Sequence, residues 1–293
     1  MLNISADEKK ALKGRGIILN RDGETFSARV ITEDGVLNAE QMKCVSEIAK
    51  KYGNGKIAMT VRMTIELQGI AYENIEPMCQ MLDSVGLYTG GTGPKIRPIV
   101  ACKGTVCVHG LIDTQAVARE LHQKFYLGWH DVTLPHKFKI GVGGCPNNCI
   151  KPGLNDFGIM GQRVPRYNPE LCKACGKCSV EEKCPMKICH KGEDGKMVYD
   201  QSLCTNCGKC IDACPFHAIE EVQVGYKILL GGIWGKHQRL ATPLPGVYTH
   251  DQMIAILEKT LTLWKEQGKA GERFGLFLER TGFENFQKQL LGK

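Results

Sequence analysis

The feature that most constrains this chain is a cysteine motif that occurs twice. Three cysteines spaced by two residues are followed by a Cys-Pro pair: Cys172, Cys175, Cys178 with Cys184-Pro185, and Cys204, Cys207, Cys210 with Cys214-Pro215. In such an arrangement the triplet wraps one corner of a [4Fe–4S] cubane, and the cysteine before proline reaches across to the other cluster. The spacing predicts one cubane on Cys172, Cys175, Cys178 and Cys214, and a second on Cys204, Cys207, Cys210 and Cys184.

The segment around these motifs resembles the bacterial two-cluster ferredoxins. Residues 162–221 hold nine of the fifteen cysteines and few aliphatic residues, which is typical of a fold held by clusters. Five residues precede Cys184 where such ferredoxins have three, so we expect a longer loop there. Structural zinc is the alternative, but zinc sites use isolated ligand pairs and not triplets with a fourth Cys-Pro.

Four more cysteines form a separate pattern. Cys102 and Cys107 lie in ACKGTVC, and Cys145 and Cys149 lie in GGCPNNC; each pair follows an apolar stretch and sits in a glycine-containing loop. Two such loops could close over a third [4Fe–4S] cluster. A zinc site or idle thiols are the alternatives. Cys44 and Cys79 fall within predicted helices and are expected to pack as small apolar residues, and Cys189 is assigned no role.

Bulk properties narrow the class of protein. A chain of 293 residues with 43% apolar residues is expected to form about two domains. The first residues have no apolar signal region and no later stretch could span a bilayer, which predicts a cytoplasmic protein without a membrane span. The net charge of +7 comes without a basic run or interleaved aromatics, so an anionic cofactor or substrate is favoured over nucleic acid.

Periodicity predicts two α/β units. In the first, Asn38 and Gln41 form a capping box for a helix that ends before Gly53, residues 56–70 alternate as one strand, and a second helix spans 74–85. The boundary between the two units is expected in the segment GGTGPKIRP, which is rich in glycine and proline. The second unit has strands from Ile99 and in HKFKIGV and GYKILLGG, with helices at 114–123 and 251–267. We therefore expect domains at 1–92 and at 93–161 with 222–293, the latter interrupted by residues 162–221.

Four segments resemble the sulfite and nitrite reductases that couple siroheme to a [4Fe–4S] cluster: TVRMTIELQGI, the first cysteine pair, LPHKFKIGVGGCPNNC, and GYKILLGGIWGKHQRLA. The resemblance covers most of the chain. It implies an α+β fold with a ferredoxin-like half-domain, a siroheme domain and the inserted ferredoxin domain. It also implies that Cys149 bridges the third cluster to the siroheme iron, for a six-electron reduction of sulfite to sulfide. The first pair here has four intervening residues where the family pattern has five, which leaves that loop's path open.

Basic residues complete the expected site. Lys137 and Lys139 alternate with Phe138 and Ile140 and so share one face of a strand that runs into a cysteine loop. Arg62 is expected on the polar face of its strand, and Arg97 precedes Cys102. Solvated surface charges are the ordinary interpretation, but matching positions in the family line the substrate side of siroheme. Guanidinium and ammonium groups neutralise sulfite and supply protons. The siroheme carboxylates are expected to contact a further four residues: Lys103, Lys151, His237 and Arg239.

Two other functions stay open. Nitrite reduction uses the same cofactor and the same bases; we favour sulfite because the ferredoxin insert and the KFK strand resemble the anaerobic and dissimilatory sulfite enzymes. A non-catalytic electron-transfer subunit is the other alternative, although an idle site would not need four bases. Larger family members contain the two-domain pair twice, so an oligomer or complex is expected. No G-x-G-x-x-G unit opens a helix, which points to a separate flavoprotein, ferredoxin or other iron–sulfur electron donor.

Overall fold

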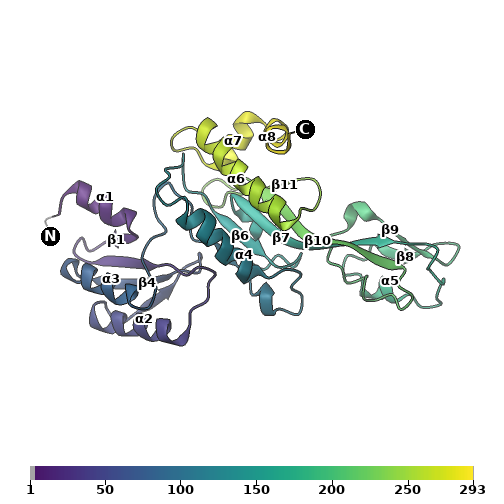
Figure 1. Cartoon of the computed structure of the whole chain (residues 1–293), viewed down its shortest axis with the longest axis horizontal. Coiled ribbons are helices and arrows are strands. Elements are labelled where there is room, and N and C mark those ends of the chain that lie inside the picture. Colours follow the sequence, from purple (N-terminus) through teal and green to yellow (C-terminus); the bar gives the residue numbers. More distant parts are fainter. Residues whose placement is uncertain (1–3, 293) are drawn as a thin grey trace.

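The structure, a computed structural model, describes residues 4–292 and has three parts arranged in a row (Figure 1). An N-terminal α/β unit lies at one end, a central unit built on a five-stranded sheet lies in the middle, and a cysteine-rich lobe lies at the other end. None of the described helices is long and apolar enough to cross a membrane.

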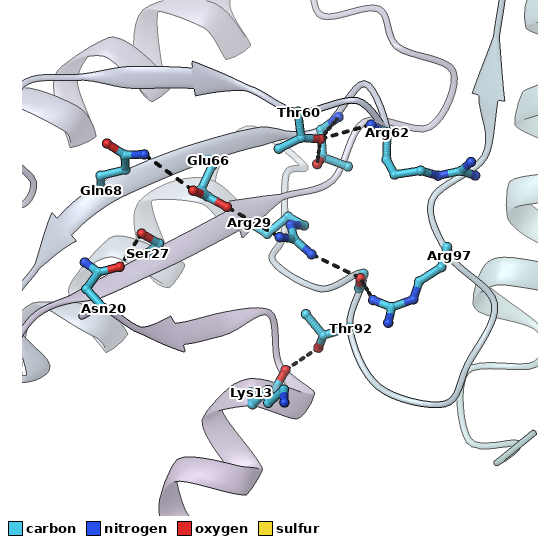
Figure 2. Close-up of polar contacts among 12 residues, drawn as sticks. Lys13, Asn20, Ser27, Arg29, Thr60, Arg62, Glu66, Gln68, Thr92 and Arg97 are labelled. Carbon is cyan, nitrogen blue, oxygen red and sulfur yellow. Dashed lines mark hydrogen bonds and ion pairs between the residues drawn. The ribbon is translucent and has the colours of Figure 1, made fainter. Parts of the chain in front are cut away.

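The N-terminal unit is an antiparallel sheet with three helices around it. Its strands are β1 (Ile17–Leu19), β2 (Phe26–Val30), β3 (Ile57–Met59) and β4 (Ile65–Ile70), in the order β1-β2-β4-β3. Its helices are α1 (Ala6–Gly14), α2 (Ala39–Lys51) and α3 (Ile75–Asp83). Phe26, Ala28 and Leu67 point from the sheet into a core with α2 and α3. The alternate side chains of β2 and β4 leave the other face polar, with Ser27, Arg29, Glu66 and Gln68 in a row (Figure 2).

Both helix predictions in this unit are confirmed, but the single strand at 56–70 is wrong. Asn38 caps α2, and its side chain and that of Gln41 form the expected capping box. The alternating stretch instead folds into a hairpin, β3 to β4, that reverses at residues 60–64. The Thr60 and Thr64 hydroxyls lie 2.6 Å apart across the turn, and Met63 adopts a φ of 57°. Arg62 therefore lies at the tip of a turn and not on a strand face.

The central unit carries a mixed sheet in the order β11-β10-β7-β6-β5. β5 (Val100–Ala101), β6 (Ile140–Gly143) and β7 (Phe157–Tyr167) run parallel, and β10 (Ile219–Leu230) and β11 (Thr242–Pro243) complete it in antiparallel fashion. The strand predicted over HKFKIGV begins only at Ile140. Short 3₁₀ turns occur in this unit at Gly104–Val106 and Pro152–Leu154, and in the N-terminal unit and the lobe at Tyr72–Asn74 and Gln201–Leu203.

Four helices bury an aromatic core against this sheet. They are α4 (Thr114–Leu121), which continues as a wider π-helical turn to Leu127, α6 (His250–Gln267), α7 (Phe274–Thr281) and α8 (Phe283–Leu291). The predicted helices at 114–123 and 251–267 are thus confirmed. Phe138 lies 5.4 Å from the rings of both Trp264 and Phe274, which anchors the segment before β6 to the C-terminal helices.

The lobe extends from the central sheet on the long antiparallel ribbon of β7 and β10, which continues past residues 162 and 221 with a shift of register between Glu221 and Gln223 (Figure 1). It contains α5 (Ser179–Lys183) and the hairpin β8 (Cys189–Lys191) to β9 (Met197–Tyr199). Its apolar core is small and consists mainly of Val180, Met197, Ile211 and Ile219 with several cysteines. Cys189 packs within it, as Cys44 packs in the core of the N-terminal unit.

Candidate functional site

Two parallel strands bring the first cysteine group together. Cys102 directly follows β5, and Cys145 lies two residues after β6, so both leave the same edge of the sheet. All four thiols are free, and the Gly144 N–H donates to Cys102 Sγ across the two loops at 3.1 Å. Burial raises the pKa of the Cys145 thiol, and the nearby Cys102, Cys149 and Cys107 sulfurs raise it further. The structure thus gathers the four cysteines in one place.

Glycine allows these loops to approach. A Cβ on Gly144 would lie 2.9 Å from Gly104 Cα and 3.4 Å from Cys102 Sγ, and a Cβ on Gly104 would lie 2.6 Å from Thr114 Cγ2. The backbones therefore touch where any side chain would separate them. Within residues 4–292 no three His, Cys, Asp or Glu side chains converge on a point that could hold a single metal ion. A cubane has a different requirement, because each of its four irons takes one thiolate.

The lobe cysteines line two cavities. One, of about 450 Å³, contains Cys184, Cys204, Cys207 and Cys210 in its wall, together with Cys189. The other, of about 420 Å³, contains Cys172, Cys175, Cys178 and Cys214. Each cavity thus draws three cysteines from one motif and the Cys-Pro cysteine from the other, which is the exchange that the spacing predicts. Val180, Met197 and Ile219 belong to both walls and separate the two cavities.

Arg62 joins the N-terminal and central units. From the β3–β4 turn its guanidinium reaches the second unit, where Nε donates to Pro98 O at 3.0 Å and Nη2 donates to Pro98 O and to Ile140 O. Nη1 donates to Asn155 Oδ1 at 2.6 Å. Burial lowers the pKa of Arg62 to about 10, so it keeps its charge at neutral pH. Four of its five N–H groups are engaged in these contacts.

Lys137 and Lys139 lie at the amino end of β6, next to a buried carboxylate that the sequence analysis missed. Asp156 is fully buried and accepts the Lys139 backbone N–H at 2.9 Å and two contacts from Arg273 Nη2 at 2.9 and 3.0 Å. Burial lowers the pKa of Lys139 to about 8, and the neighbouring Arg273 lowers it further, against the attraction of Asp156. The same causes lower the pKa of Lys137.

Arg29 and Arg97 meet at the carbonyl of Gly91, to which both donate (Figure 2). Arg29 also pairs with Glu66 at 3.4 Å, and burial lowers the pKa of Arg97. The Nε atoms of Arg29, Arg97 and Arg273 are buried without a hydrogen-bond partner. Arg29 could have been found from FSARV, where it alternates with Phe26, Ala28 and Val30. No local signal marks Asp156 or Arg273.

The four residues expected to contact siroheme carboxylates differ in availability. Lys103, Lys151 and His237 are exposed, and Lys151 adopts a left-handed backbone beside the Cys145–Cys149 loop. Arg239 is already engaged, because its guanidinium donates to the carbonyls of Leu230 and Gly231 and pairs with Glu279 at 3.2 Å. In this structure Arg239 therefore stabilises the loop after β10.

These features fit an anionic macrocycle beside the third cysteine group. Three buried guanidinium N–H groups lack an acceptor, and four cations lack a carboxylate within ion-pair distance among residues 4–292: Arg62, Arg97, Lys137 and Lys139. Lys139 is separated from the cysteine loop by the length of β6. A single small anion could not contact both places, whereas a polycarboxylate tetrapyrrole could extend between them.

The chain is similar to several known proteins. It is 33% identical over 94% of its length to the coenzyme F420-dependent sulfite reductase of Methanocaldococcus jannaschii, of which it covers 43%. It is 30% identical to an uncharacterised protein of the same organism, with 94% of each chain covered. With the dissimilatory-type sulfite reductase subunit alpha of Allochromatium vinosum it shares 25% identity, over 84% of this chain and 64% of that one. The chain thus spans about half the length of several curated relatives.

Solved structures share the fold. Dissimilatory sulfite reductase I superposes with a TM-score of 0.72 at 23% identity, over 92% of this chain and 69% of that one. The NirA protein of Mycobacterium tuberculosis superposes with a TM-score of 0.69 at 15% identity, over 99% of this chain and 47% of that one.

Sequence profiles cover both units. The ferredoxin-like half-domain of nitrite and sulfite reductases matches residues 18–85, and the nitrite and sulphite reductase 4Fe-4S domain matches residues 92–293. This family implies siroheme and [4Fe–4S] cofactors, which agrees with the four cysteines at one edge of the sheet and the unpartnered cations. The chain belongs to the nitrite and sulfite reductase family.

Proposed function

We propose that this chain is a siroheme-dependent sulfite reductase that carries a two-cluster ferredoxin domain within its catalytic domain. The observation that carries the proposal is the group of buried, unpartnered Nε atoms on Arg29, Arg97 and Arg273, at the joint where Lys137 and Lys139 lie. Buried polar groups in native proteins usually have a partner, and His122, Tyr167, Thr260 and Trp264 also carry buried atoms without one; the three arginines differ in being cationic and grouped, which supports an anionic ligand there.

The proposed cofactor set is one siroheme and three [4Fe–4S] clusters. Cys102, Cys107, Cys145 and Cys149 would hold the cluster next to siroheme, with Cys149 as the bridge; its exposure leaves it accessible from outside the loop. Lys103, Lys151 and His237 would contact siroheme carboxylates, and we add Arg29 to this group. Arg239 would instead hold the loop after β10 in place. When bound, siroheme and its cluster supply the iron site and the electrons for the reduction.

The protein's own groups would then bind and protonate the substrate. Sulfite takes six electrons and seven protons to give hydrosulfide and three waters. Arg62 and Arg97 would neutralise the sulfite oxygens, and Lys137 and Lys139 would hold protons at Nζ where oxygen leaves as water. A Lys139 pKa of about 8 suits this role, because the ammonium is present at neutral pH and gives up its proton readily. Arg273 and Asp156 would hold these lysines in place.

The lobe would deliver the electrons. We assign the ferredoxin domain to residues 162–221, with the β7–β10 ribbon as its base, between the halves of the siroheme domain at 93–161 and 222–293; residues 1–92 form the half-domain. The proposed donor is a separate flavoprotein, ferredoxin or other iron–sulfur protein. We also propose that the chain works as an oligomer or in a complex, in the reducing cytoplasm where fifteen thiols stay unpaired.

Relatives support sulfite over nitrite. The curated relatives with the greater identities include the F420-dependent sulfite reductase and an anaerobic sulfite reductase polypeptide of Salmonella typhimurium, which is 32% identical over 57% of this chain. A nitrite reductase of Bacillus subtilis is 22% identical.

The test is an anaerobic absorption spectrum with iron, zinc and acid-labile sulfide measured on the same sample. We expect a siroheme Soret band and about thirteen irons per chain, from three cubanes and one haem iron. About eight irons and no tetrapyrrole band after reconstitution would overturn the proposal and leave an electron-transfer subunit. With siroheme present, the kcat/KM values for sulfite and for nitrite decide the substrate, and a higher value for nitrite would refute sulfite reduction.

A further inference from the structure

The joint between the lobe and the central unit contains a cavity that brings two cysteine groups close to each other. The cavity, of about 580 Å³, is lined by Cys145, Pro146 and Asn147 with residues 108–111 on the central side. On the lobe side its wall is formed by Arg163, Asp212 and residues 207–209. Cys145 and Cys207 therefore face one shared space.

The Cys204–Cys210 cavity of the lobe shares Cys207 and Gly208 with this joint cavity, whereas the lobe cavity that contains Cys172 and Cys214 shares no residue with it. Electron transfer weakens steeply with distance, so the Cys204–Cys210 side of the lobe is the side from which electrons would leave for the central unit. The distance between the Cys204–Cys210 loop and Cys145 would then set the rate of electron transfer to the central unit.

Arg163 fixes that loop through three kinds of contact. Its backbone N–H donates to Asn206 O at 2.8 Å, and Arg163 and Cys207 pair as a parallel bridge. Its aliphatic stem lies directly on Gly208, where an added Cβ would come within 2.5 Å of Arg163 Cδ. Its guanidinium pairs with Asp212 of the loop at 2.9 Å and with Glu221 of β10.

These contacts tie the loop to both strands of the ribbon. The Arg163 side chain is 24% exposed, although its partners Asp212 and Glu221 are 71% and 42% exposed. Arg166, on the same strand, makes a comparable pair with Glu220, but its side chain is 69% exposed and no contact joins it to the cysteine loop in the described part of the chain. Arg163 and Arg166 thus carry the same charge, but Arg163 alone contacts the cysteine loop.

We propose that Arg163 is a positioning residue that holds the Cys204–Cys210 loop against the Cys145–Asn147 loop and so fixes the gap between the two cysteine groups. The consequence for electron transfer rests on the proposed function. The claim that Arg163 holds the loop in place does not require siroheme. Clusters held at Cys207 and at Cys145 would exchange a single electron across this gap, the first being oxidised and the second reduced, with no bond made or broken.

The experiment compares Arg163→Met with Arg166→Met in the full-length protein isolated anaerobically. Hydrogen exchange is measured first, because it requires no activity. We expect about tenfold faster exchange at residues 204–212 in Arg163→Met, corresponding to a local opening that is about 1.4 kcal/mol easier. Residues 172–178 in that variant, and both segments in Arg166→Met, should exchange as in the wild type. Unchanged exchange at 204–212 would overturn the inference.

Electron paramagnetic resonance of the dithionite-reduced protein supplies the redox readout. Arg163→Met should keep its iron content but lose the magnetic coupling between the clusters at Cys207 and Cys145, and full coupling would refute the positioning role. If Arg163→Met does not fold, Asp212→Asn removes one of its pairs at an exposed carboxylate and should show the same changes in smaller measure; wild-type behaviour there would also count against the inference. Absence of siroheme in the wild type would refute the proposed function alone.

Discussion

Replacing Asp156 with asparagine should destabilise the central unit strongly. The Asp156 side chain is fully buried, and its partner Arg273 is only 12% exposed. The amide keeps the shape and one acceptor for the Lys139 N–H but removes the negative charge that pairs with Arg273. Breaking a buried ion pair by removing one partner costs about 3–5 kcal/mol, because the other charge is left uncompensated.

The magnitude can be checked by anaerobic urea unfolding followed by circular dichroism. Glu76→Gln is the matched control, since Glu76 also pairs with an arginine, Arg15, at 2.6 Å, but the two side chains are 64% and 46% exposed. An exposed pair contributes about 0–1 kcal/mol, so the control should unfold nearly as the wild type does.

A double-mutant cycle tests the cause. Arg273→Met combined with Asp156→Asn removes both charges, so the double variant should be clearly more stable than the sum of the two single losses predicts. If the losses simply add, or if Asp156→Asn alone costs about as little as the surface control, then our account of Asp156 as the charge partner of Arg273 is wrong.

Three further predictions concern the site. Lys139 has a pKa of about 8, so kcat/KM for sulfite should fall above about pH 8 as the ammonium is lost; this limb should disappear in Lys139→Arg and persist in Lys137→Arg, and a limb unchanged in Lys139→Arg would contradict the assignment. Gly144→Ala should lower the iron content by about four irons per chain, which corresponds to one lost cubane, because the new Cβ would separate the two cysteine loops. Gly153→Ala is the control and should keep the full iron content, because a Cβ there meets nothing within 4 Å. Arg62→Lys keeps the charge but loses the forked contacts to Pro98, Ile140 and Asn155, so it should lower the free energy of unfolding by about 2–4 kcal/mol, and an unchanged urea midpoint would show that Arg62 does not tie the units together.

Local patterns predicted the parts of this molecule that local geometry determines. The capping box at Asn38 and Gln41 forms as expected because both contacts lie within one helical turn. The two predicted groups of lobe cysteines likewise line two separate cavities, although Cys189, which the spacing does not mark, also lies in the wall of one; that each group holds a cubane stays a prediction.

The turn at residues 60–64 shows where such patterns mislead. Alternation continues through it because Val61 and Met63 are apolar, yet at the tip of the hairpin Val61 is 98% exposed. The turn contains no glycine, proline or asparagine; it is closed by two threonine hydroxyls, and Met63 takes a positive φ that glycine usually supplies. A turn built from side chains that also suit a strand carries no signal for the sequence analysis to find.

Asp156 and Arg273 were missed for a different reason. They lie 117 residues apart and meet only because Phe138, Trp264 and Phe274 pack the C-terminal helices against the segment before β6. No periodicity relates such residues, so their pairing depends on the folded core. Arg62 illustrates the same limit, because its acceptors Pro98, Ile140 and Asn155 belong to three distant segments.

The charge balance where the N-terminal unit meets the central unit links stability to ligand binding. Among the described residues, Glu66 and Asp156 neutralise Arg29 and Arg273, while Arg62, Arg97, Lys137 and Lys139 have no carboxylate partner. Burial lowers the pKa of Lys139, and the charges of Arg273, Arg62 and Lys137 lower it further, so the cations at this place repel one another and cost stability in the absence of an anion. An anionic ligand that binds only the folded protein relieves this repulsion and stabilises the fold through mass action. The excess of positive charge that Asp156 only partly offsets is therefore expected to favour binding of a polyanionic cofactor and a small oxyanion at the same place.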